Sequence, residues 1–468
     1  MIRPASRPEP LRHADLKALA RRYDRSAPRY TSYPMVPYWD PSFDAADYRT
    51  ALDALAEAPD EALSVYVHLP FCARRCYYCG CNAMATSRTD VVDAYLDRVE
   101  REVWRVAARI GLARRVTQLH WGGGTPNLLD RAQMIRLYGL LATAFHLDPD
   151  AEVSIEMDPR VGSPAQMRLL RELGFTRISL GVQDLDDGVQ AAIGRLQSEA
   201  DTVQLFEAAR AEGFGSINLD LVYGLPRQSV DTVSRTVDRV VALRPDRVAL
   251  FGYAHVPSAR PHQRAIDEGA LPDPGDRLAL FLTALERLEG AGYTWLGLDH
   301  FVLHDDALAR AARARRLQRN FMGYVDRRAP HTLAFGTSAI GSVAGRFVQA
   351  HAKLGPYQKA IDAGGLAVAR GHTLSRDDRF RGAVIRHLMC NMEIDLDITV
   401  SGFGVPVDGE LPAAVDRLAP YIDDGLLEPA TRRFRVTRPG RFFLRTLATE
   451  FDRYARDTAR EPVFSRVV

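Results

Sequence analysis

Four of the five cysteines in this 468-residue chain lie within ten residues, at Cys72, Cys76, Cys79 and Cys81. Cysteines at this density usually form disulfides, a zinc site or an iron–sulfur cluster. Disulfides fit poorly, because the only other cysteine is Cys390. Structural zinc usually recruits ligands from two separated segments, and the sequence offers no second segment. The C-x3-C-x2-C spacing of the first three cysteines instead predicts a [4Fe–4S] cluster that keeps one iron open to a further ligand.

The region from about residue 62 to residue 300 alternates short β-rich runs with amphipathic segments. This pattern is typical of a parallel α/β sheet or barrel. Strands are predicted near 63–69, 116–121, 152–157, 176–182, 216–223 and 247–253, with a seventh near 293–299. A helix is predicted over 90–110, with Thr89 or Asp90 as its cap. The fold class is therefore α/β, and its functional loops are expected at the carboxyl ends of the strands.

Glycine-rich or polar segments follow most of these predicted strands. They are W-G-G-G-T-P at 121–126, E-M-D-P at 156–159, G-V-Q-D at 181–184, G-R-L-Q at 194–197, N-L-D-L-V-Y-G-L-P at 218–226 and Y-A-H at 253–255. Glycines allow backbone amides to approach a ligand closely. Any one such residue is more often a cap or a surface group, but the series predicts a single site at one edge of the sheet.

The cysteine triplet is the signature of radical S-adenosylmethionine enzymes, which this chain resembles. That resemblance implies a partial (β/α)6 barrel whose cluster cleaves S-adenosylmethionine to a 5′-deoxyadenosyl radical. The fourth cysteine, the Y-V-H string at 66–68 and the R-Y-T-S-Y-P string at 29–34 narrow the resemblance. They are similar to the oxygen-independent coproporphyrinogen III oxidases, which decarboxylate two propionates of coproporphyrinogen III to vinyl groups and form protoporphyrinogen IX.

The resemblance also implies a set of cofactor contacts. The cluster ligands would be Cys72, Cys76 and Cys79. One S-adenosylmethionine would contact Tyr66, Gly123, Glu156, Gln183, Arg195, Asp220 and Ala254. A second S-adenosylmethionine would contact Tyr78, Gly124, Thr125 and Ile340.

The catalytic and substrate-binding candidates are fewer. Cys81 lies too close to the triplet for an obvious ligand role, so we expect it near the substrate as a late hydrogen donor. His68 is expected to hydrogen-bond around the cluster or to shuttle a proton, and a strand-end histidine with satisfied hydrogen bonds is an equal interpretation. Guanidinium groups bind carboxylates bidentately, which makes Arg29, Arg195 and Arg319 candidates for binding the propionates.

The segment 319–326 departs from the family pattern. The family typically has R-N-F-Q-G-Y-T-T, whereas this chain has R-N-F-M-G-Y-V-D. Met322 replaces an amide, and Val325 and Asp326 replace two hydroxyl side chains. Gly194 stands where asparagine is common in the family. These differences leave the cofactor chemistry untouched and concern the substrate or the second cofactor molecule.

We expect four regions along the chain. They are an N-terminal arm over 1–60, the barrel over 61–300, an extension over 301–374 with second-cofactor and substrate contacts, and a mainly α C-terminal domain over 375–468. In the last region a helix near 411–422, a glycine turn at 424–425 and a hairpin resemble a winged-helix module. Such modules bind DNA in other proteins, but a lid over the barrel is the favoured interpretation here.

Composition limits the partners. The net charge is +2 and no apolar run approaches the roughly 20 residues that span a bilayer, so neither nucleic acid nor membrane is predicted as a partner. The N-terminus lacks the apolar segment of a secretory signal, and an oxygen-sensitive cluster suits a reducing compartment, so a cytoplasmic protein is predicted. The resemblance implies a tetrapyrrole substrate, an external electron donor and acceptor, and a monomer.

Three alternative functions share some of these features. A related radical enzyme acting on another tetrapyrrole or on a C-methylation substrate would use the same cofactors, and Met322 motivates this alternative. A haem chaperone of the same superfamily would carry an H-N-x-x-Y-W motif and lack the fourth cysteine, contrary to this sequence. A nucleic-acid-binding iron–sulfur protein would require a basic stripe, which the charge balance does not show.

Overall fold

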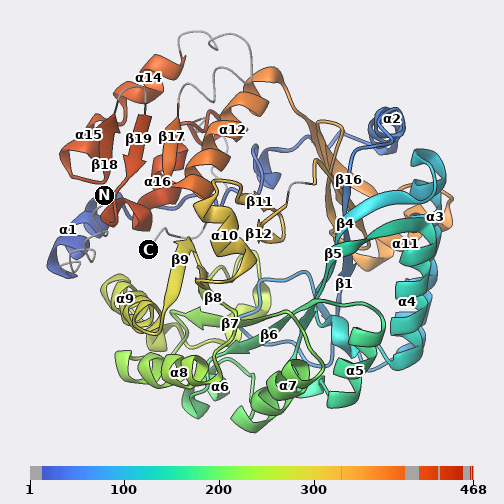
Figure 1. Ribbon diagram of the computed structural model, residues 1–468, viewed down its shortest axis with the longest axis horizontal. Coiled ribbons are helices and arrows are strands. Elements are labelled where there is room, and N and C mark those ends of the chain that lie inside the picture. The colour runs from blue at the N-terminus through green and yellow to red at the C-terminus, as the bar shows by residue number, and fades with distance from the viewer. Residues whose placement is uncertain are drawn as a thin grey trace.

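The computed structural model describes residues 13–327, 329–395, 410–430, 433–456, 464 and 466, and within them a 12-stranded sheet forms the centre of the molecule (Figure 1). Six strands of this sheet are consecutive in the chain, adjacent in space and parallel. They are β1 (Leu63–Leu69), β4 (Arg114–Gly123), β5 (Phe145–Met157), β6 (Arg177–Gln183), β7 (Ser216–Tyr223) and β8 (Arg247–Gly252). The six predicted strands are thus confirmed.

Further strands extend the sheet at both edges. Beyond β8 lie β10 (His300–Leu303) and then β9 (Tyr293–Gly297), so the seventh predicted strand forms but pairs with β10 and not with β8. Beyond β1 lie β13 (His331–Phe335), β14 (Ile340–Val343), β15 (Arg346–Ala350) and β16 (Val368–Thr373). In the described chain β9 and β16 are the two edges, and the sheet is therefore a partial barrel, as expected.

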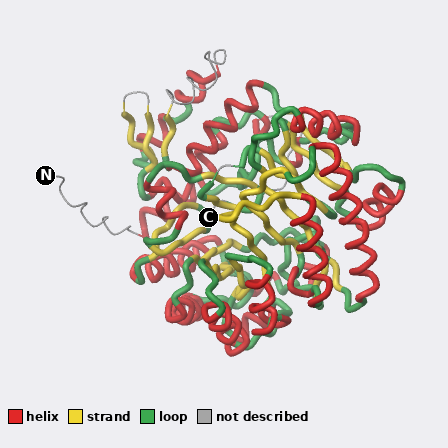
Figure 2. Tube along the Cα trace, turned by 45° about the vertical axis from the view of Figure 1, so that its right-hand side comes forward, coloured by secondary structure: helices red, strands yellow, loops and turns green. Residues whose placement is uncertain are grey.

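Helices lie outside the strands and cover the sheet (Figures 1 and 2). Along the parallel strands these are α3 (Thr89–Ile110), α4 (Arg131–Ala144), α5 (Pro164–Glu172), α6 (Asp187–Ala192), α7 (Glu199–Ala211), α8 (Val230–Leu243) and α9 (Pro274–Gly290). The predicted cap of α3 is wrong, because its N-cap is Arg88 and makes no side-chain cap bond. Arg88 instead donates to the carboxylate of Asp90, which occupies that side chain.

Shorter elements join the barrel to the rest of the chain. They are β2 (Phe71–Cys72), β3 (Met84–Ala85), α10 (Ala307–Arg313), β11 (Gln318–Asn320), β12 (Gly323–Val325) and α11 (Leu354–Asp362). The N-terminal arm contains α1 (His13–Tyr23) and α2 (Ala45–Ala56). No helix in the described part of the chain is both long enough and apolar enough to cross a bilayer.

The C-terminal region combines helices with a small sheet. Its elements are α12 (Arg376–Asn391), β17 (Glu393–Asp395), α14 (Glu410–Asp416), α15 (Ala419–Asp423), β18 (Leu427–Ala430), β19 (Arg433–Val436) and α16 (Leu444–Thr449). The helix expected near 411–422 is therefore two helices, and Pro420 enters the first turn of the second. The expected hairpin forms as β18–β19, and β17 joins it.

The arm packs against this C-terminal region. Tyr23 stacks near Tyr421, with ring centroids 4.9 Å apart, and Arg22 pairs with Asp424 at 2.7 Å. Tyr30 in the R-Y-T-S-Y-P string donates to Asp452 at 3.0 Å. The described part of the arm is therefore held against the C-terminal region, where Arg445 also donates to the carbonyls of Ala27 and Pro28.

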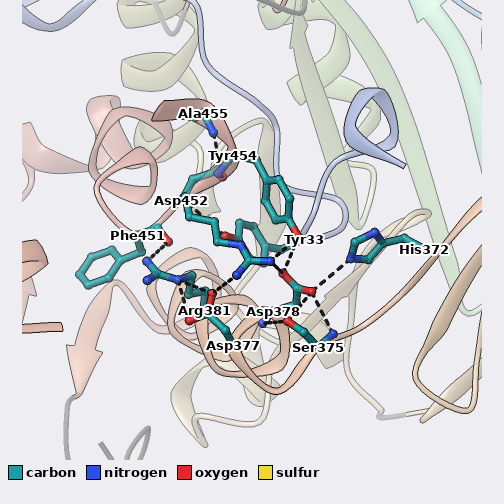
Figure 3. A network of polar contacts seen from close by, with 11 residues as sticks. Tyr33, His372, Ser375, Asp377, Asp378, Arg381, Phe451, Asp452, Tyr454 and Ala455 are labelled. Carbon is teal, nitrogen blue, oxygen red and sulfur yellow. Dashed lines mark hydrogen bonds and ion pairs between the residues drawn. The ribbon is translucent and has the colours of Figure 1, made fainter. Parts of the chain in front are cut away.

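Asp378 on α12 is the centre of a buried polar network that includes the arm (Figure 3). Its carboxylate accepts hydrogen bonds from Ser375, from His372 at 3.1 Å and from the Tyr454 hydroxyl at 2.8 Å. Beside it, the backbone N–H of Arg453 donates to the Tyr33 hydroxyl at 3.1 Å. Burial alone would raise the pKa of Asp378, but the bonds from His372 and Ser375 outweigh it and hold the pKa well below the ordinary value.

We expect Asp378→Ala to lower the free energy of unfolding by about 3 kcal/mol, because several buried donors lose their acceptor together. Urea unfolding of the full chain measures the change. The matched control is Asp238→Ala, since Asp238 is exposed and pairs only at the surface with Arg287; its cost should stay below about 1 kcal/mol. Equal losses in the two variants would contradict a stabilising role for the network.

Candidate active site

A cavity of about 560 Å³ lies at the carboxyl ends of the parallel strands, within the size range of small-molecule sites. It brings together most of the residues that the sequence predicted. Its walls include Arg29, Cys72, Cys76, Tyr78, Cys79, Cys81, Gly123, Gly124, Thr125, Glu156, Gln183, Arg195, Asp220 and Ala254. Four predicted residues do not line it, namely Tyr66, His68, Arg319 and Ile340.

The cysteine loop is held in place by its own ends and by the barrel. The short parallel strands β2 and β3 clasp the loop, with Cys72 opposite Ala85. The backbone N–H of Tyr77 donates to Ile193 at 2.9 Å, and the Gln263 amide donates to the Tyr78 carbonyl at 3.0 Å. These bonds hold the loop against the segments that contain Ile193 and Gln263.

All five cysteines are free thiols, so this structure contains no disulfide. Each thiol of the triplet has a hydrogen-bond donor beside its sulfur. The Thr125 hydroxyl lies 3.3 Å from Cys72 Sγ, and the Cys81 backbone N–H lies 3.4 Å from Cys79 Sγ. Such bonds stabilise thiolates and tune the potential of iron–sulfur clusters. The residues present therefore fit a cluster, and Thr125 contacts Cys72, one of the three predicted cluster ligands.

The three thiols of the cysteine loop are not arranged around a single point. In the described part of the chain no three His, Cys, Asp or Glu side chains converge closely enough to hold one ion. A cube-shaped cluster does not require such convergence, because each thiolate binds a different iron.

Cys76 lies beside a buried ion-pair network. Arg195 donates to both carboxylate oxygens of Asp158 at 3.1 Å, and Arg160 binds the same carboxylate at 2.6 Å. Their guanidinium groups lie 3.6 and 3.7 Å from Cys76 Sγ. Burial alone would raise the pKa of Asp158, but the bond from Arg160 and the charge of Arg195 lower it. Since Arg195 is occupied by Asp158, a direct bond to a substrate propionate is not the role the structure favours for it.

Glu156 is presented to the cavity by its neighbours on β4. One carboxylate oxygen accepts from the Gly123 N–H at 3.0 Å, and the other lies 3.3 Å from His120 Nε2. Its side chain is still 45% exposed, so it can accept further bonds from a ligand. Gly122 also packs against this carboxylate, since a Cβ there would lie 3.0 Å from an oxygen. The G-G-G turn and Glu156 are thus one unit, able to bind an ammonium group.

Asp220 on β7 accepts hydrogen bonds from Ser179 at 2.8 Å and from Asn218 at 2.7 Å. Burial raises its pKa to about 6. An unfolded aspartate ionises near pH 3.9, so between about pH 4 and 6 the folded state alone keeps the proton. Above this interval the ionised group lowers the stability of the fold.

We therefore expect the stability of the wild type relative to Asp220→Asn to fall as the pH rises. The difference between their free energies of unfolding should decrease by about 2–3 kcal/mol from pH 4 to pH 7, as linkage requires for a pKa raised by folding. Urea unfolding at closely spaced pH values measures it. A difference that does not vary with pH would show that Asp220 ionises normally in the fold.

Tyr66 and His68, both on β1, do not line the main cavity and contact each other. The Tyr66 hydroxyl and His68 Nδ1 are 2.9 Å apart, and His68 Nε2 is 2.9 Å from the Asn82 carbonyl. Both ring nitrogens therefore have partners. A Cβ on Gly123 would lie 2.8 Å from the His68 ring, so the histidine packs directly against the glycine turn. This placement matches the interpretation of His68 as a satisfied strand-end histidine.

Arg319 and Ile340 lie outside the main cavity. Arg319 stacks over the Tyr324 ring at 5.0 Å and donates weakly to the Arg29 carbonyl at 3.5 Å. Ile340 pairs with Gln349 at the start of β14. Two of the residues that depart from the family pattern line different cavities. Met322 lines the main cavity, and Val325 lines another one.

Gly194 has a simple conformational explanation. Its φ is +63°, in the left-handed region that glycine and asparagine adopt most readily. A Cβ at this position would lie 2.9 Å from the Tyr77 ring. Glycine therefore suits the backbone here and lets Tyr77 of the cysteine loop pack closely.

Several cavity residues were not found by the sequence reasoning. They are His120, Arg160, Arg177, Ser179, Asn218, Arg247, His300 and Tyr324. A signal existed for those within strands, since R-I-S on β6 and N-L-D on β7 place polar side chains at alternate positions of otherwise apolar runs. Arg160 and His300 had no such signal, because Arg160 follows β5 and His300 begins the short strand β10.

Comparison with known proteins agrees with this geometry. The radical SAM superfamily model matches residues 66–240, and the HemN C-terminal domain model matches residues 374–443. Oxygen-independent coproporphyrinogen III oxidases from Salmonella typhimurium and Escherichia coli K12 are each 40% identical over 451 residues, and that of Pseudomonas aeruginosa is 41% identical over 452. Each alignment covers 96% of this chain and 98% of the relative.

A solved structure, coproporphyrinogen III oxidase (HemN) from Escherichia coli, is similar with a TM-score of 0.88 and 39% identity. The match covers 91% of this chain and 97% of that one. A cysteine triplet at the carboxyl edge of a parallel partial barrel, beside a ligand-sized cavity, defines a radical SAM enzyme, which uses a [4Fe–4S] cluster and S-adenosylmethionine. Within that class, the chain belongs to the family of oxygen-independent coproporphyrinogen III oxidases.

Proposed function

We propose that this enzyme converts coproporphyrinogen III to protoporphyrinogen IX without oxygen, as a step of haem biosynthesis. The observation that carries the proposal is the main cavity, where the cysteine triplet shares one space with the glycine turn, Glu156 and Asp220. Arg29, Arg177 and Arg247 also line this cavity, and they pair with Asp299, Glu152 and Asp306 respectively. Identity of about 40% to named oxidases over nearly the whole chain supports the same assignment.

The reaction removes one carboxylate from each of two propionates. When bound, the cluster and S-adenosylmethionine would supply a 5′-deoxyadenosyl radical able to take a hydrogen atom from the propionate β-carbon. The remaining side chain loses CO2 and passes one electron to an external acceptor, so that –CH2–CH2–COO⁻ becomes –CH=CH2. No oxygen atom enters the product.

The residues of the chain bind and orient the reactants. Cys72, Cys76 and Cys79 would hold the cluster, Glu156 with the glycine turn would bind the amino group of S-adenosylmethionine, and Asp220 would bind its ribose. Gln183, Arg195 and Ala254 complete this first position, with Tyr66 supporting it. Such a site contributes to the rate mainly by holding the C–H bond close to the radical carbon and by excluding water.

A second S-adenosylmethionine belongs to the same proposal. Tyr78, Gly124 and Thr125 line the main cavity, which supports a second position on the cysteine-loop side, whereas Ile340 on β14 does not line this cavity. Cys81 has an exposed side chain and faces the same cavity, which suits a hydrogen donor. We further propose that the protein is cytoplasmic, because the cluster is oxygen-sensitive and suits a reducing compartment. The family resemblance supports a monomer that uses an external electron donor and acceptor.

Anaerobic reconstitution tests the proposal. The purified protein receives coproporphyrinogen III, S-adenosylmethionine and a reductant, and the tetrapyrroles are separated by chromatography. Protoporphyrinogen IX with 5′-deoxyadenosine and CO2 is the expected result. Formation of 5′-deoxyadenosine while all propionates survive would overturn the substrate and favour the related radical enzyme, and haem co-purifying with inert protein would favour the chaperone.

Met322 provides a second arm of this test, because it lines the cavity where relatives carry an amide. We expect Met322→Gln to change kcat/KM by less than about tenfold, since the two side chains are similar in length and the position accommodates either. A variant that gains activity by several orders of magnitude would mean that the natural substrate of this chain differs from coproporphyrinogen III.

A further inference from the structure

A second, smaller cavity lies next to the main one, and Arg29 and Gly252 line both. Its walls carry guanidinium groups from distant parts of the chain: Arg29 in the arm, Arg277 on α9, and Arg441 and Arg445 in the C-terminal region. We call these four residues the arginine pocket. The shared walls at Arg29 and Gly252 place the arginine pocket directly beside the main cavity.

The pocket carries an excess of positive charge. Among the described residues that line it, Asp299 is the one carboxylate, and it pairs with Arg29. Arg466 also lines the cavity, and it pairs with Asp24 at 2.7 Å. Burial lowers the pKa of Arg29 to about 9 and that of Arg441 to about 10. A buried cluster of like charges is stabilised by an anion, because the anion replaces the water that each guanidinium has lost.

The fold makes specific room for these guanidinium groups. Gly224, with φ of +82°, leaves space that a Cβ would take from Arg277 Nη1. Arg277 lies over the Tyr223 ring at 5.6 Å, and Arg441 lies over the Trp295 ring at 4.5 Å. Stacking on an aromatic face leaves the guanidinium edge able to meet a planar anion. One N–H of Arg441 already donates to the Trp295 carbonyl, and Arg445 donates to the carbonyls of Ala27, Pro28 and Arg466.

Size limits what the pocket can hold. Its volume is about 40 Å³, and one water occupies roughly 10–15 Å³ on the same measure. The space fits a carboxylate with its methylene group but not a tetrapyrrole ring. Aromatic walls formed by Tyr223, Phe281, Trp295 and Phe442 suit the apolar stem of such an arm.

We propose that the arginine pocket binds the carboxylate of one propionate of the substrate while another propionate lies in the main cavity beside the cluster. This inference rests on the proposed function, since it takes the tetrapyrrole as substrate. Anchoring a remote propionate would set which side chain reaches the radical position, so the pocket is a specificity site and not part of the reacting centre.

The test compares binding of coproporphyrin III, the stable oxidised form, with binding of its tetramethyl ester. Fluorescence titration gives the affinity of each for the wild type, Arg277→Gln, Arg277→Lys and Arg441→Gln. The control is Arg287→Gln, on the same helix, whose side chain is 40% exposed and pairs with Asp238. Iron content after reconstitution checks that each variant folds and holds its cluster.

We expect Arg277→Gln and Arg441→Gln to weaken binding of the acid about tenfold while binding of the ester changes less than about twofold, because only the acid uses charged hydrogen bonds. Arg277→Lys should fall between, and Arg287→Gln should match the wild type. In turnover, KM should rise with kcat nearly unchanged.

Unchanged preference for the acid in both Gln variants would overturn the pocket as a carboxylate site, as would an equal loss in Arg287→Gln. Failure of the proposed function looks different. The wild type would then not convert coproporphyrinogen III, whatever the acid-to-ester ratio of the variants shows.

Discussion

Replacement of Cys72, Cys76 or Cys79 by alanine should each reduce turnover by at least about 10³-fold and leave little iron in the reconstituted protein. Loss of groups that merely hydrogen-bond to metal ligands costs about 10- to 100-fold, and removal of a ligand itself should cost more. All three thiols lie on the loop that faces the main cavity. Iron and sulfide content, the visible absorption of the cluster and 5′-deoxyadenosine formation measure the effect.

Two other cysteines supply the controls. Cys390→Ala changes a buried thiol of α12, so it should retain both iron and turnover. Cys81→Ser should retain the cluster and lose turnover, because Cys81 is expected to act on the substrate. If Cys81→Ser lost its iron while Cys76→Ala kept it, the assignment of the ligand triplet would be wrong.

Asp158→Asn should lower the free energy of unfolding by about 3 kcal/mol, because it leaves Arg195 buried without its counter-charge. The side chains of Asp158 and Arg195 are only 9% and 6% exposed. The same change should alter the reduction potential of the cluster, since Arg195 and Arg160, which both bind Asp158, also lie against Cys76 Sγ. Anaerobic urea unfolding and a potentiometric titration measure the two effects.

Asp150→Asn is the matched control for this second prediction. Asp150 pairs with Arg327 at 2.6 Å, but its side chain is 70% exposed, so the cost should be below about 1 kcal/mol. Both results would be contradicted if Asp158→Asn unfolded like the control and kept the wild-type potential. The network would then be incidental to the cluster.

Much of the fold was predictable because its signals are local. The six parallel strands are short β-rich runs between amphipathic helices, and each overlaps its predicted range, although β5 already begins at Phe145 and not at residue 152. The edges were less predictable. β9 pairs with β10 because a tight connection at 298–299 favours a hairpin, and the sequence pattern alone did not distinguish this from a further parallel strand.

The site divides in the same way. Residues at strand ends, such as Glu156 and Asp220, were found because parallel strands bring their carboxyl ends to one edge. The roles of Tyr66 and Thr125 were not evident, since their hydroxyl groups bond to His68 and Cys72 respectively. A hydroxyl side chain has partners in many directions, and its sequence position does not tell which one it takes.

The sequence by itself determined the class of chemistry. Three thiols on one short loop stay close together however the rest of the chain folds, and their spacing suits an iron–sulfur cluster. The sequence also determined the order of the parallel strands, since the alternation of strand and helix allows few topologies. Only the tertiary structure decided the long-range pairings of charge. Arg195 joins Asp158 beside Cys76, and arginines from residues 29, 277, 441 and 445 meet in one pocket. Such contacts join residues hundreds of positions apart, so no local pattern encodes them and packing alone brings them together.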